Sequence, residues 1–295
     1  MIIDKSVQTL VLGAAIALGM AGSAKAFSFA DFANNSNLTL NGSAKVANFG
    51  GQDVLRLTDG LGQSGSAFLT EAISLDKDAS FSTAFQFQIT DPVGIYDSDG
   101  QGADGITFVV QTLSNNVGGA GGGIGYAGIA NSVGVEFDSW NNGYIDGNNG
   151  NHIGINLNGN VDSIARRNLS PRLNDGGLWN AWVDYNGVAD LLEVRVSQTE
   201  ERPEEAFLSY NADLASVLRS NNAFIGFTSG TGGAGGDHDI RSWQFNNSYK
   251  PIDGAKRKGV PEPTSILGLL AFSTLGSISM LKRKQQHKIL NSSYS

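Results

Sequence analysis

One stretch in the middle of the sequence, VGVEFDSWNNGYIDGNNGNHIGINLN, gathers carboxylate, amide and imidazole side chains that could hold metal ions. Glu136 and Asp138 alternate with apolar residues, so the period of two in a β-strand places both carboxylates on one face. A loop rich in Gly and Asn then supplies Asn142 and Asp146, and His152 opens a second alternating run. Oxygen ligands suit calcium, whereas carboxylates with a neutral imidazole suit a transition ion such as manganese.

The segment VEFDSWNN, followed by Asp146 and HIGIN, resembles the metal-binding segment of the legume-type (L-type) lectins. The resemblance implies that one ion, Mn²⁺ or another divalent transition ion, is held by Glu136, Asp138, Asp146 and His152. It implies that Ca²⁺ is held by Asp138, the carbonyl of Trp140, Asn142 and Asp146. The two Asp residues would bridge both ions. The alternative is an acidic, Asn-rich surface loop with a hydrated histidine.

A second set of residues resembles the sugar site of the same family. Asp104 lies in an Ala-Asp-Gly sequence before an apolar strand, and in L-type lectins this Asp accepts hydrogen bonds from sugar hydroxyls and follows a cis peptide bond. A Gly-rich segment there offers a backbone N–H to the sugar, which implies Gly123. The full carbohydrate-binding set is Asp104, Gly123, Trp140, Asn142, Gly232 and Gly233. An ordinary Asp-Gly turn and flexible loop glycines are the alternatives.

Trp140 and His238 are expected to differ in their environments. Continued strand alternation puts the Trp140 ring on the same side as Glu136 and Asp138, facing the site rather than the core. We expect a loop from Thr228 to Asp239, in which His238 is solvated and is not a metal ligand.

From residue 27 to residue 247, short β-forming runs alternate with clusters of Gly, Asn, Asp and Ser, without long helical periodicity. This pattern predicts an all-β fold, an antiparallel β-sandwich, and the resemblance implies its concanavalin A-like jelly-roll form. Expected strands are Leu38–Leu40, Val54–Leu57, Phe81–Ile89, Ile106–Gln111 and Leu191–Ser197. Asn186-Gly187 predicts a tight hairpin turn with positive φ between Trp179–Tyr185 and Val188–Val196. Residues Asp213–Leu218 predict one short helix.

The amino-terminal residues 1–26 resemble a signal peptide for export. Lys5 precedes a short apolar core, Leu10–Met20, and a small-x-small cleavage site ends at Ala26. A permanent membrane anchor is the alternative, although the apolar core falls short of the roughly 20 residues that span a bilayer.

The carboxyl-terminal residues predict a membrane segment. Residues 248–263 read as a charged, turn-rich linker, residues 264–284 as an apolar transmembrane run with a basic end, and residues 285–295 as a cytoplasmic tail. The order Pro-Glu-Pro, apolar span, basic cluster resembles the bacterial PEP-CTERM sorting tail. It implies transfer across the inner membrane, with anchoring there before processing, to the cell surface or extracellular matrix. A buried core helix is the alternative.

The chain of 295 residues contains no cysteine, so an exported domain must be stable without disulfides. Its formal net charge of −8 argues against nucleic acid as a partner and agrees with cation binding. The length between the two ends suffices for one large β domain with a substantial core.

Together these patterns lead to the hypothesis of an exported, metal-dependent carbohydrate-binding protein that is not an enzyme. A glucanase is the first alternative, because Glu136-x-Asp138 resembles the Glu-x-Asp-x-Glu strand of laminarinase-type hydrolases. Position 140 holds Trp where that strand needs a third acid, so the carboxylates are better explained as ligands. A structural matrix protein without sugar binding is the second alternative. The sugar, and whether the chain forms a homo-oligomer, stay open.

Overall fold

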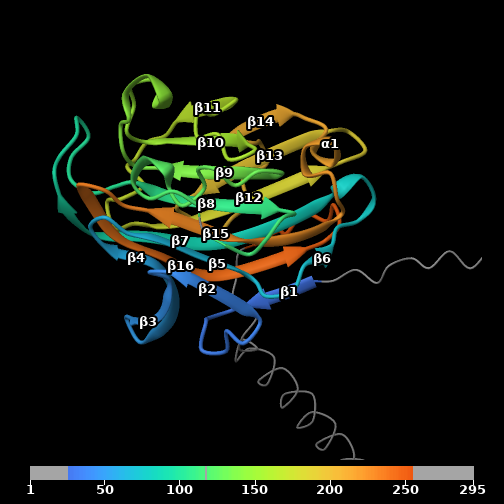
Figure 1. Cartoon of the computed structure of the whole chain (residues 1–295), viewed down its shortest axis with the longest axis horizontal. Helices are drawn as coiled ribbons and strands as arrows, with labels where there is room; N and C mark the ends of the chain where they lie inside the picture. Colours follow the sequence, from blue (N-terminus) through green and yellow to red (C-terminus); the bar gives the residue numbers. More distant parts are fainter. Residues whose placement is uncertain (1–25, 117, 255–295) are drawn as a thin grey trace, which may run out of the picture. The chain divides into compact units, whose positions relative to one another are not determined.

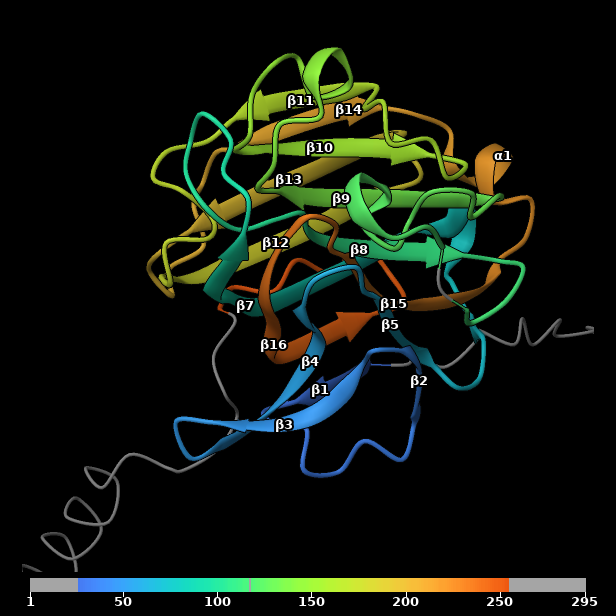
Figure 2. The same ribbon diagram turned by 60° about the vertical axis from the view of Figure 1, so that its left-hand side comes forward.

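The computed structural model describes residues 26–116 and 118–254, which form two antiparallel sheets packed face to face (Figures 1 and 2). The back sheet has the order β14-β13-β12-β7-β16-β4-β3, with β1 paired to β16. Its strands are β1 (Ala26–Phe29), β3 (Lys45–Phe49), β4 (Gln52–Gly60), β7 (Phe81–Gly94), β12 (Leu178–Asn186), β13 (Leu191–Ser197), β14 (Leu208–Asn211) and β16 (Ala234–Asn246).

The front sheet has the order β11-β10-β9-β8-β15-β5-β2, with β6 paired to β15. Its strands are β2 (Leu38–Gly42), β5 (Ser64–Leu69), β6 (Ile73–Ser74), β8 (Gly105–Gln111), β9 (Ser132–Asp138), β10 (His152–Leu157), β11 (Ala165–Asn168) and β15 (Asn222–Gly230). The helical turns are η1 (Lys77–Ala79), η2 (Gly121–Gly123), η3 (Gly143–Asp146) and α1 (Leu214–Leu218). The predicted all-β antiparallel sandwich is confirmed.

The core between the sheets is rich in aromatic side chains from central strands. The Phe85 ring of β7 lies 5.6 Å from that of Phe137 in β9 and 4.9 Å from that of Phe227 in β15, measured between centroids. Trp243 of β16 lies 4.9 Å from Phe227 in the same way. Full burial of each Phe stabilises the fold by roughly 2 to 3 kcal/mol. A core of this kind can stabilise a chain that has no disulfides.

The short helix α1 forms where the sequence predicts it. Asp213 caps its amino terminus, since the Asp213 side chain accepts a hydrogen bond of 3.0 Å from the backbone N–H of Ser216. The helix ends at Arg219, which has a φ of 57°. Leu214 and Leu218 are buried, so the helix attaches to the sandwich by one apolar face.

The predicted hairpin between β12 and β13 is present, but the prediction of a tight turn with positive φ at Asn186-Gly187 is wrong. The strands pair from Asn180↔Ser197 to Asn186↔Leu191, so four residues connect them, and the positive φ of 51° falls on Asp190. Gly187 is needed for a different reason. A Cβ at Gly187 would lie 1.7 Å from the carbonyl oxygen of Asp78, so the close approach of another segment selects glycine there.

The loop predicted from Thr228 to Asp239 is much shorter in the structure, because β15 continues to Gly230 and β16 begins at Ala234. The expected solvated state of His238 is therefore wrong. His238 is fully buried in β16, with its Nδ1 2.7 Å from Thr58 Oγ1 and 3.1 Å from the Gly236 carbonyl oxygen. Burial lowers the pKa of His238 to about 4.

Residues 248–254, expected as the start of a linker, pack against the back sheet, and we call them the C-terminal strap. The backbone N–H of Lys250 donates to Ser82 Oγ at 3.0 Å, and Gly254 bridges to Glu201. Ile252 packs against buried Ala84 and Trp182. The strap thus extends the fold beyond its last strand.

Most of the terminal expectations lie outside the described residues. Of the expected signal peptide only Ala26 is described, as the first residue of β1. Residues 255–295, which include the end of the expected linker, the transmembrane run and the tail, are also outside. Within residues 26–116 and 118–254, none of the helices has the length and apolar character needed to cross a bilayer.

Candidate metal centre and adjoining ligand site

Strand register brings three predicted ligands onto one face of the front sheet. His152 of β10 pairs with Asp138 of β9, and Gly154 pairs with Glu136. The residues between them, such as Phe137, point into the core, which confirms the alternation expected for β9. Gly154 leaves room for its partner, since a Cβ there would lie 2.3 Å from Glu136 Oε1.

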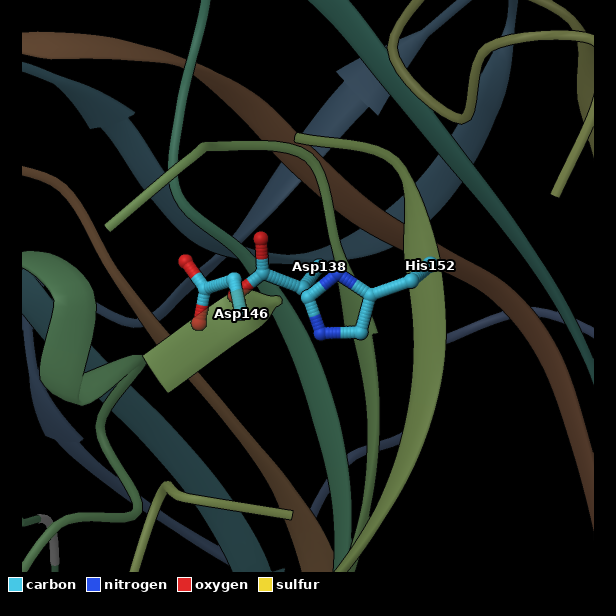
Figure 3. Close-up of side chains that lie close together, drawn as sticks. All are labelled: Asp138, Asp146 and His152. Atoms are coloured by element: carbon cyan, nitrogen blue, oxygen red, sulfur yellow. The ribbon is translucent and has the colours of Figure 1, made fainter. Parts of the chain in front are cut away.

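Asp138, Asp146 and His152 form a compact group of potential metal ligands. One ligand atom from each lies within 4.8 Å of the others, and all three residues are buried. Asp146 reaches the group from η3, and Figure 3 shows both carboxyl groups beside the imidazole ring. Two carboxylates and one imidazole are a donor set suited to a divalent cation.

Glu136 lies next to this group but is held by other partners. Its Oε1 is 3.3 Å from His152 Nε2 and also accepts a hydrogen bond from Ser163 Oγ, while its Oε2 accepts one from Asn156 Nδ2. Asn156 continues the alternation of His152 and Gly154 in β10, so the sequence pattern could have revealed it. Ser163 follows β10 in a loop, and no sequence signal marks it.

The carboxylates of this group disfavour one another's charge. Burial, followed by repulsion from Glu136 and Asp146, raises the pKa of Asp138 well above its usual value. Burial also raises the pKa of Asp146. A cation at this position would relieve both effects. The buried Oδ1 of Asn142 has no hydrogen-bond partner in the described chain, which leaves a further oxygen ligand available. The residues present therefore fit bound metal ions.

The loop after β9 is held by its own polar groups. The Trp140 N–H donates to Asp138 Oδ1 at 2.8 Å, and the Asn142 N–H donates to Asp146 Oδ2. Since β9 ends at Asp138, the strand alternation used to orient the Trp140 ring does not reach it. Trp140 is half-buried rather than fully turned toward solvent.

Two side chains that hold this loop by hydrogen bonds were not predicted from the sequence. Asp97 Oδ2 accepts a hydrogen bond of 3.1 Å from the N–H of Asn141, although the two are 44 positions apart. Arg166 donates to the carbonyl oxygen of Ile145 in η3. Neither residue belongs to a recognisable motif, because each acts from a distant segment.

Asp104 lies beside the metal group and follows a cis peptide bond from Ala103, as the resemblance implied. Its N–H donates to the Gly230 carbonyl at 3.1 Å, and its own carbonyl accepts from Ser139 N–H at 2.9 Å. The Asp104 side chain is buried, and its Oδ2 has no hydrogen-bond partner among the described residues. Burial, with repulsion from Asp146, raises the pKa of Asp104 to about 7.

The expected glycines surround Asp104 unequally. A Cβ on Gly232 would lie 3.8 Å from Asp104 Oδ2, whereas a Cβ on Gly233 would lie 3.3 Å from Ile95 Cδ1. In η2, a Cβ on Gly122 would lie 2.5 Å from Asn142 Nδ2, whereas the N–H of Gly123 already donates to Ala120. Gly232 is therefore closer than Gly233 to the unpartnered Oδ2 of Asp104, and Gly122 is closer than Gly123 to the unpartnered Oδ1 of Asn142.

Comparison with known proteins agrees with this geometry. The legume lectin domain matches residues 24–261. An L-type lectin-domain containing receptor kinase VIII.1 of Arabidopsis thaliana is 32% identical over 196 residues, which cover 64% of this chain and 26% of that protein. The chain thus spans about a quarter of the kinase's length. A bark lectin of Styphnolobium japonicum is 29% identical over 254 residues, covering 79% of this chain and 90% of the lectin.

The solved structures give the same result. Winged bean acidic lectin, complexed with methyl-α-D-galactose, has a TM-score of 0.62 and 27% identity, and the match covers 76% of this chain and 98% of that one. The family match spans most of the sequence, and the structural match includes both sheets. The chain therefore belongs to the legume lectin domain family and has the sandwich of a carbohydrate-binding lectin.

Proposed function

We propose that this chain binds carbohydrate in a metal-dependent way at the site around Asp104. The observation that carries the proposal is the Asp104 Oδ2 atom, which is buried and has no donor among the described residues. A buried acceptor without a partner is costly unless a ligand supplies the donor. Sugar hydroxyl groups are such donors, and Gly232 places no side chain next to the carboxylate, since a Cβ there would lie 3.8 Å from Asp104 Oδ2.

The metal ions would hold this site in shape. A transition ion such as Mn²⁺ fits the group of Asp138, Asp146 and His152, with Glu136 adjoining. Ca²⁺ fits the oxygens of Asp138, Asn142 and Asp146, with the carbonyl of Trp140 as a further candidate ligand. Bound ions would supply the positive charge that the carboxylates lack and fix the loop after β9. The Asn142 nitrogen and the Trp140 ring then complete the proposed sugar site.

For the glycines of the sugar site, we prefer Gly122 to Gly123 and Gly232 to Gly233. The resemblance implied Gly123, Gly232 and Gly233. Of these, Gly232 lies next to Asp104, and the neighbouring Gly122 lies nearer to Asn142 than Gly123 does. We therefore propose Gly122 as the position where backbone approaches the sugar in η2, and Gly232 in the loop before β16.

The lectin family also bears on the alternatives. Lectins bind sugars without cleaving them, so the glucanase alternative is not retained. A structural protein without sugar binding remains the competing hypothesis. Because winged bean acidic lectin was solved with methyl-α-D-galactose, galactosides are the first ligands to test.

The test measures binding of methyl galactoside, N-acetylgalactosaminide, glucoside, mannoside and fucoside by calorimetry, with Ca²⁺ and Mn²⁺ and after chelation. We expect at least one to bind only with metals present. Asp104→Asn should weaken this binding by roughly 30-fold to 100-fold while metal affinity stays unchanged. The matched control is Asp31→Asn, since Asp31 is exposed outside the site. Metal-dependent thermal stability without any binding, including on a broad glycan array, would favour the structural alternative.

We further propose that the chain is exported and carries a C-terminal membrane segment before processing. The support is the sequence alone: residues 1–26 resemble a signal peptide, and residues 264–284 are apolar and end in a basic cluster. Expression of the full chain with a tag after residue 30, followed by fractionation and mass spectrometry of the termini, tests this. Recovery of the intact amino terminus in the cytoplasm would contradict export.

A further inference from the structure

The loop between β15 and β16, residues 231–233, is held firmly although it contains two glycines. We call it the rim loop. Thr231 N–H donates to the Gln63 carbonyl at 2.9 Å, and the Thr231 carbonyl accepts from Gly121 N–H at 3.1 Å. Gly232 N–H donates to the Ala234 carbonyl at 2.9 Å. Beyond Thr231 the rim loop offers no side chain, so any selective contact beyond the first sugar must come from its neighbours.

Two exposed aliphatic residues flank the rim loop and are positioned by it. Leu61 lies in the turn between β4 and β5, where the next residue, Gly62, donates its N–H to the Gly232 carbonyl at 3.0 Å. Ile95 follows β7, and its N–H donates to the Gly233 carbonyl at 3.1 Å. The exposed fractions of Leu61 and Ile95 are 52% and 58%.

Their side chains lie close to the rim loop and to the same stretch of backbone. Leu61 Cδ2 is 2.9 Å from the position that a Cβ would take on Gly94, the residue before Ile95. Ile95 Cδ1 is 3.3 Å from the corresponding position on Gly233. The preceding residue of the rim loop, Gly232, lies next to Asp104, since a Cβ on it would be 3.8 Å from Asp104 Oδ2. The aliphatic side chains of Leu61 and Ile95, which we call the apolar step, therefore begin one residue away from the residue beside the Asp104 carboxylate.

The segment that carries Ile95 is also tied to the loop that follows β9. Two residues beyond Ile95, Asp97 accepts the N–H of Asn141 at 3.1 Å and the N–H groups of Asp99 and Gly100 at 2.8 and 3.0 Å. Ile95 is thus held between the rim loop and the metal-binding segment. Aliphatic side chains that are held in place at the edge of a polar site offer apolar contact area to a ligand bound there.

We infer that Leu61 and Ile95 form an apolar subsite for the second sugar residue of a glycan whose first residue occupies the site at Asp104. This inference rests on the proposed function. The occupant is argued from continuity: the step starts at Gly232 and Gly233, so a ring joined to the first sugar can reach it. Pyranose rings present C–H faces that bury well against aliphatic side chains, whereas their hydroxyl edges face Asp104.

The test compares matched ligands of different length. Affinities are measured for methyl galactoside and methyl lactoside, methyl glucoside and methyl maltoside, and methyl mannoside and methyl α-1,3-mannobioside, with both metals present. We expect the disaccharide of the recognised sugar to bind roughly fivefold to tenfold more tightly, as burial of about 50 Å² of apolar surface would produce. Leu61→Ser and Ile95→Ser should each remove most of this gain and leave the monosaccharide affinity unchanged.

Val188→Ser is the control, because Val188 is 79% exposed in the turn between β12 and β13. Equal disaccharide gains in wild type and in both Ser variants would overturn the subsite. The absence of any gain would overturn it too. The 4-nitrophenyl monoglycosides distinguish another occupant: a gain seen only with these, and lost in the Ser variants, would mean that the step takes an aromatic aglycone and not a sugar. If no glycoside binds, the proposed function fails and the subsite fails with it.

Discussion

Two clusters of carboxylates in this sandwich differ in the positively charged partners that surround them. In the first, Arg56 of β4 lies between Asp237 and Asp239 of β16, and its Nε and Nη2 each lie 2.8 Å from an Asp239 oxygen. In the second, no Arg or Lys of the described residues makes an ion pair with Glu136, Asp138 or Asp146, and the imidazole Nε2 of His152 lies 3.3 Å from Glu136 Oε1. The charge of Arg166 partly opposes the rise in the pKa of Asp146, but the ion pair of Arg166 is with Asp162. We call these the paired cluster and the open cluster.

The difference shows what distinguishes a ligand site from a structural one. Acidic residues close together are common to both clusters, so residue type alone does not separate them. The paired cluster contains its own counter-charge in a bidentate geometry. The open cluster raises the pKa of its own carboxylates and leaves polar atoms such as Asn142 Oδ1 without partners. Among the described residues no Arg or Lys supplies the missing counter-charge, which agrees with the metal ions proposed for this cluster.

Chelation should produce the largest effect, because it removes the counter-charge of the open cluster only. If two ions are each present at about 100 times their dissociation constants, their loss removes roughly 5 kcal/mol of stability. The melting temperature should then fall by about 10 to 20 °C, and sugar binding should disappear. Differential scanning calorimetry with EDTA, and after adding back Ca²⁺ and Mn²⁺, measures this. A melting temperature indifferent to both ions would mean that the open cluster is not a metal site.

Arg56→Met breaks the paired cluster and should cost about 3 to 5 kcal/mol of unfolding free energy, because it leaves the buried Asp239 carboxylate without its partner. Metal affinity should not change. Urea unfolding of the metal-loaded protein measures the loss, and calorimetry measures the ions. Lys45→Met is the control, since Lys45 is half exposed and its pair with Asp59 is worth at most about 1 kcal/mol. Weaker metal binding in Arg56→Met would show that the clusters are not independent.

His238 lies in the same strand as the two aspartates of the paired cluster and provides a pH test of the burial of that strand. It lies between Asp237 and Asp239, which Arg56 already binds, and its burial lowers its pKa from 6.5 to about 4. The unfolded chain therefore takes up a proton at higher pH than the folded chain, and stability falls as pH drops from 6.5 to 4. The loss reaches roughly 3 kcal/mol at the acid end. His238→Gln, unfolded by urea in EDTA, should lack this part of the pH dependence. Identical slopes for both proteins would contradict a neutral, buried His238.

Asp138→Asn should give the smallest change in stability, and with the opposite sign to Arg56→Met. Without metals it removes one of the repelling carboxylates, so we expect a gain of about 1 kcal/mol. With metals, Ca²⁺ and Mn²⁺ affinities should both fall, since Asp138 is the proposed bridge between the ions. Urea unfolding in EDTA and separate titrations of each ion provide the measurements. If only one ion responds, Asp138 is not shared.

The parts of the fold that local patterns encode were predictable from the sequence. The alternation of Val133, Val135 and Phe137 fixed the face on which Glu136 and Asp138 lie, and the structure confirms it. The cis peptide bond at Asp104 was implied by the family resemblance, and the short helix was expected from the stretch Asp213–Leu218. Each of these features depends on residues close together in the sequence.

Features that depend on distant partners were not predictable. His238 has the sequence context of a loop, and only the pairing of β16 with β4 and β7 buries it. Gly187 has the context of a tight turn, yet its conformation is set by contact with Asp78. At the site, Ser163 and Asp97 act on residues 27 and 44 positions away, respectively. Single-sequence patterns carry no record of such contacts.

The C-terminal strap has a mechanical consequence. A force applied to the chain at Gly254 would first act on the Gly254–Glu201 bridge and on the contact of Ile252 with Trp182. The hydrogen bond from the backbone N–H of Lys250 to Ser82 Oγ comes next along the strap. Behind these contacts lies β16, hydrogen-bonded to β7 on one side and to β4 and β1 on the other. Because the strap has fewer backbone hydrogen bonds than β16, we expect it to detach before β16 does, while the two sheets and the loops at their edge keep their shape.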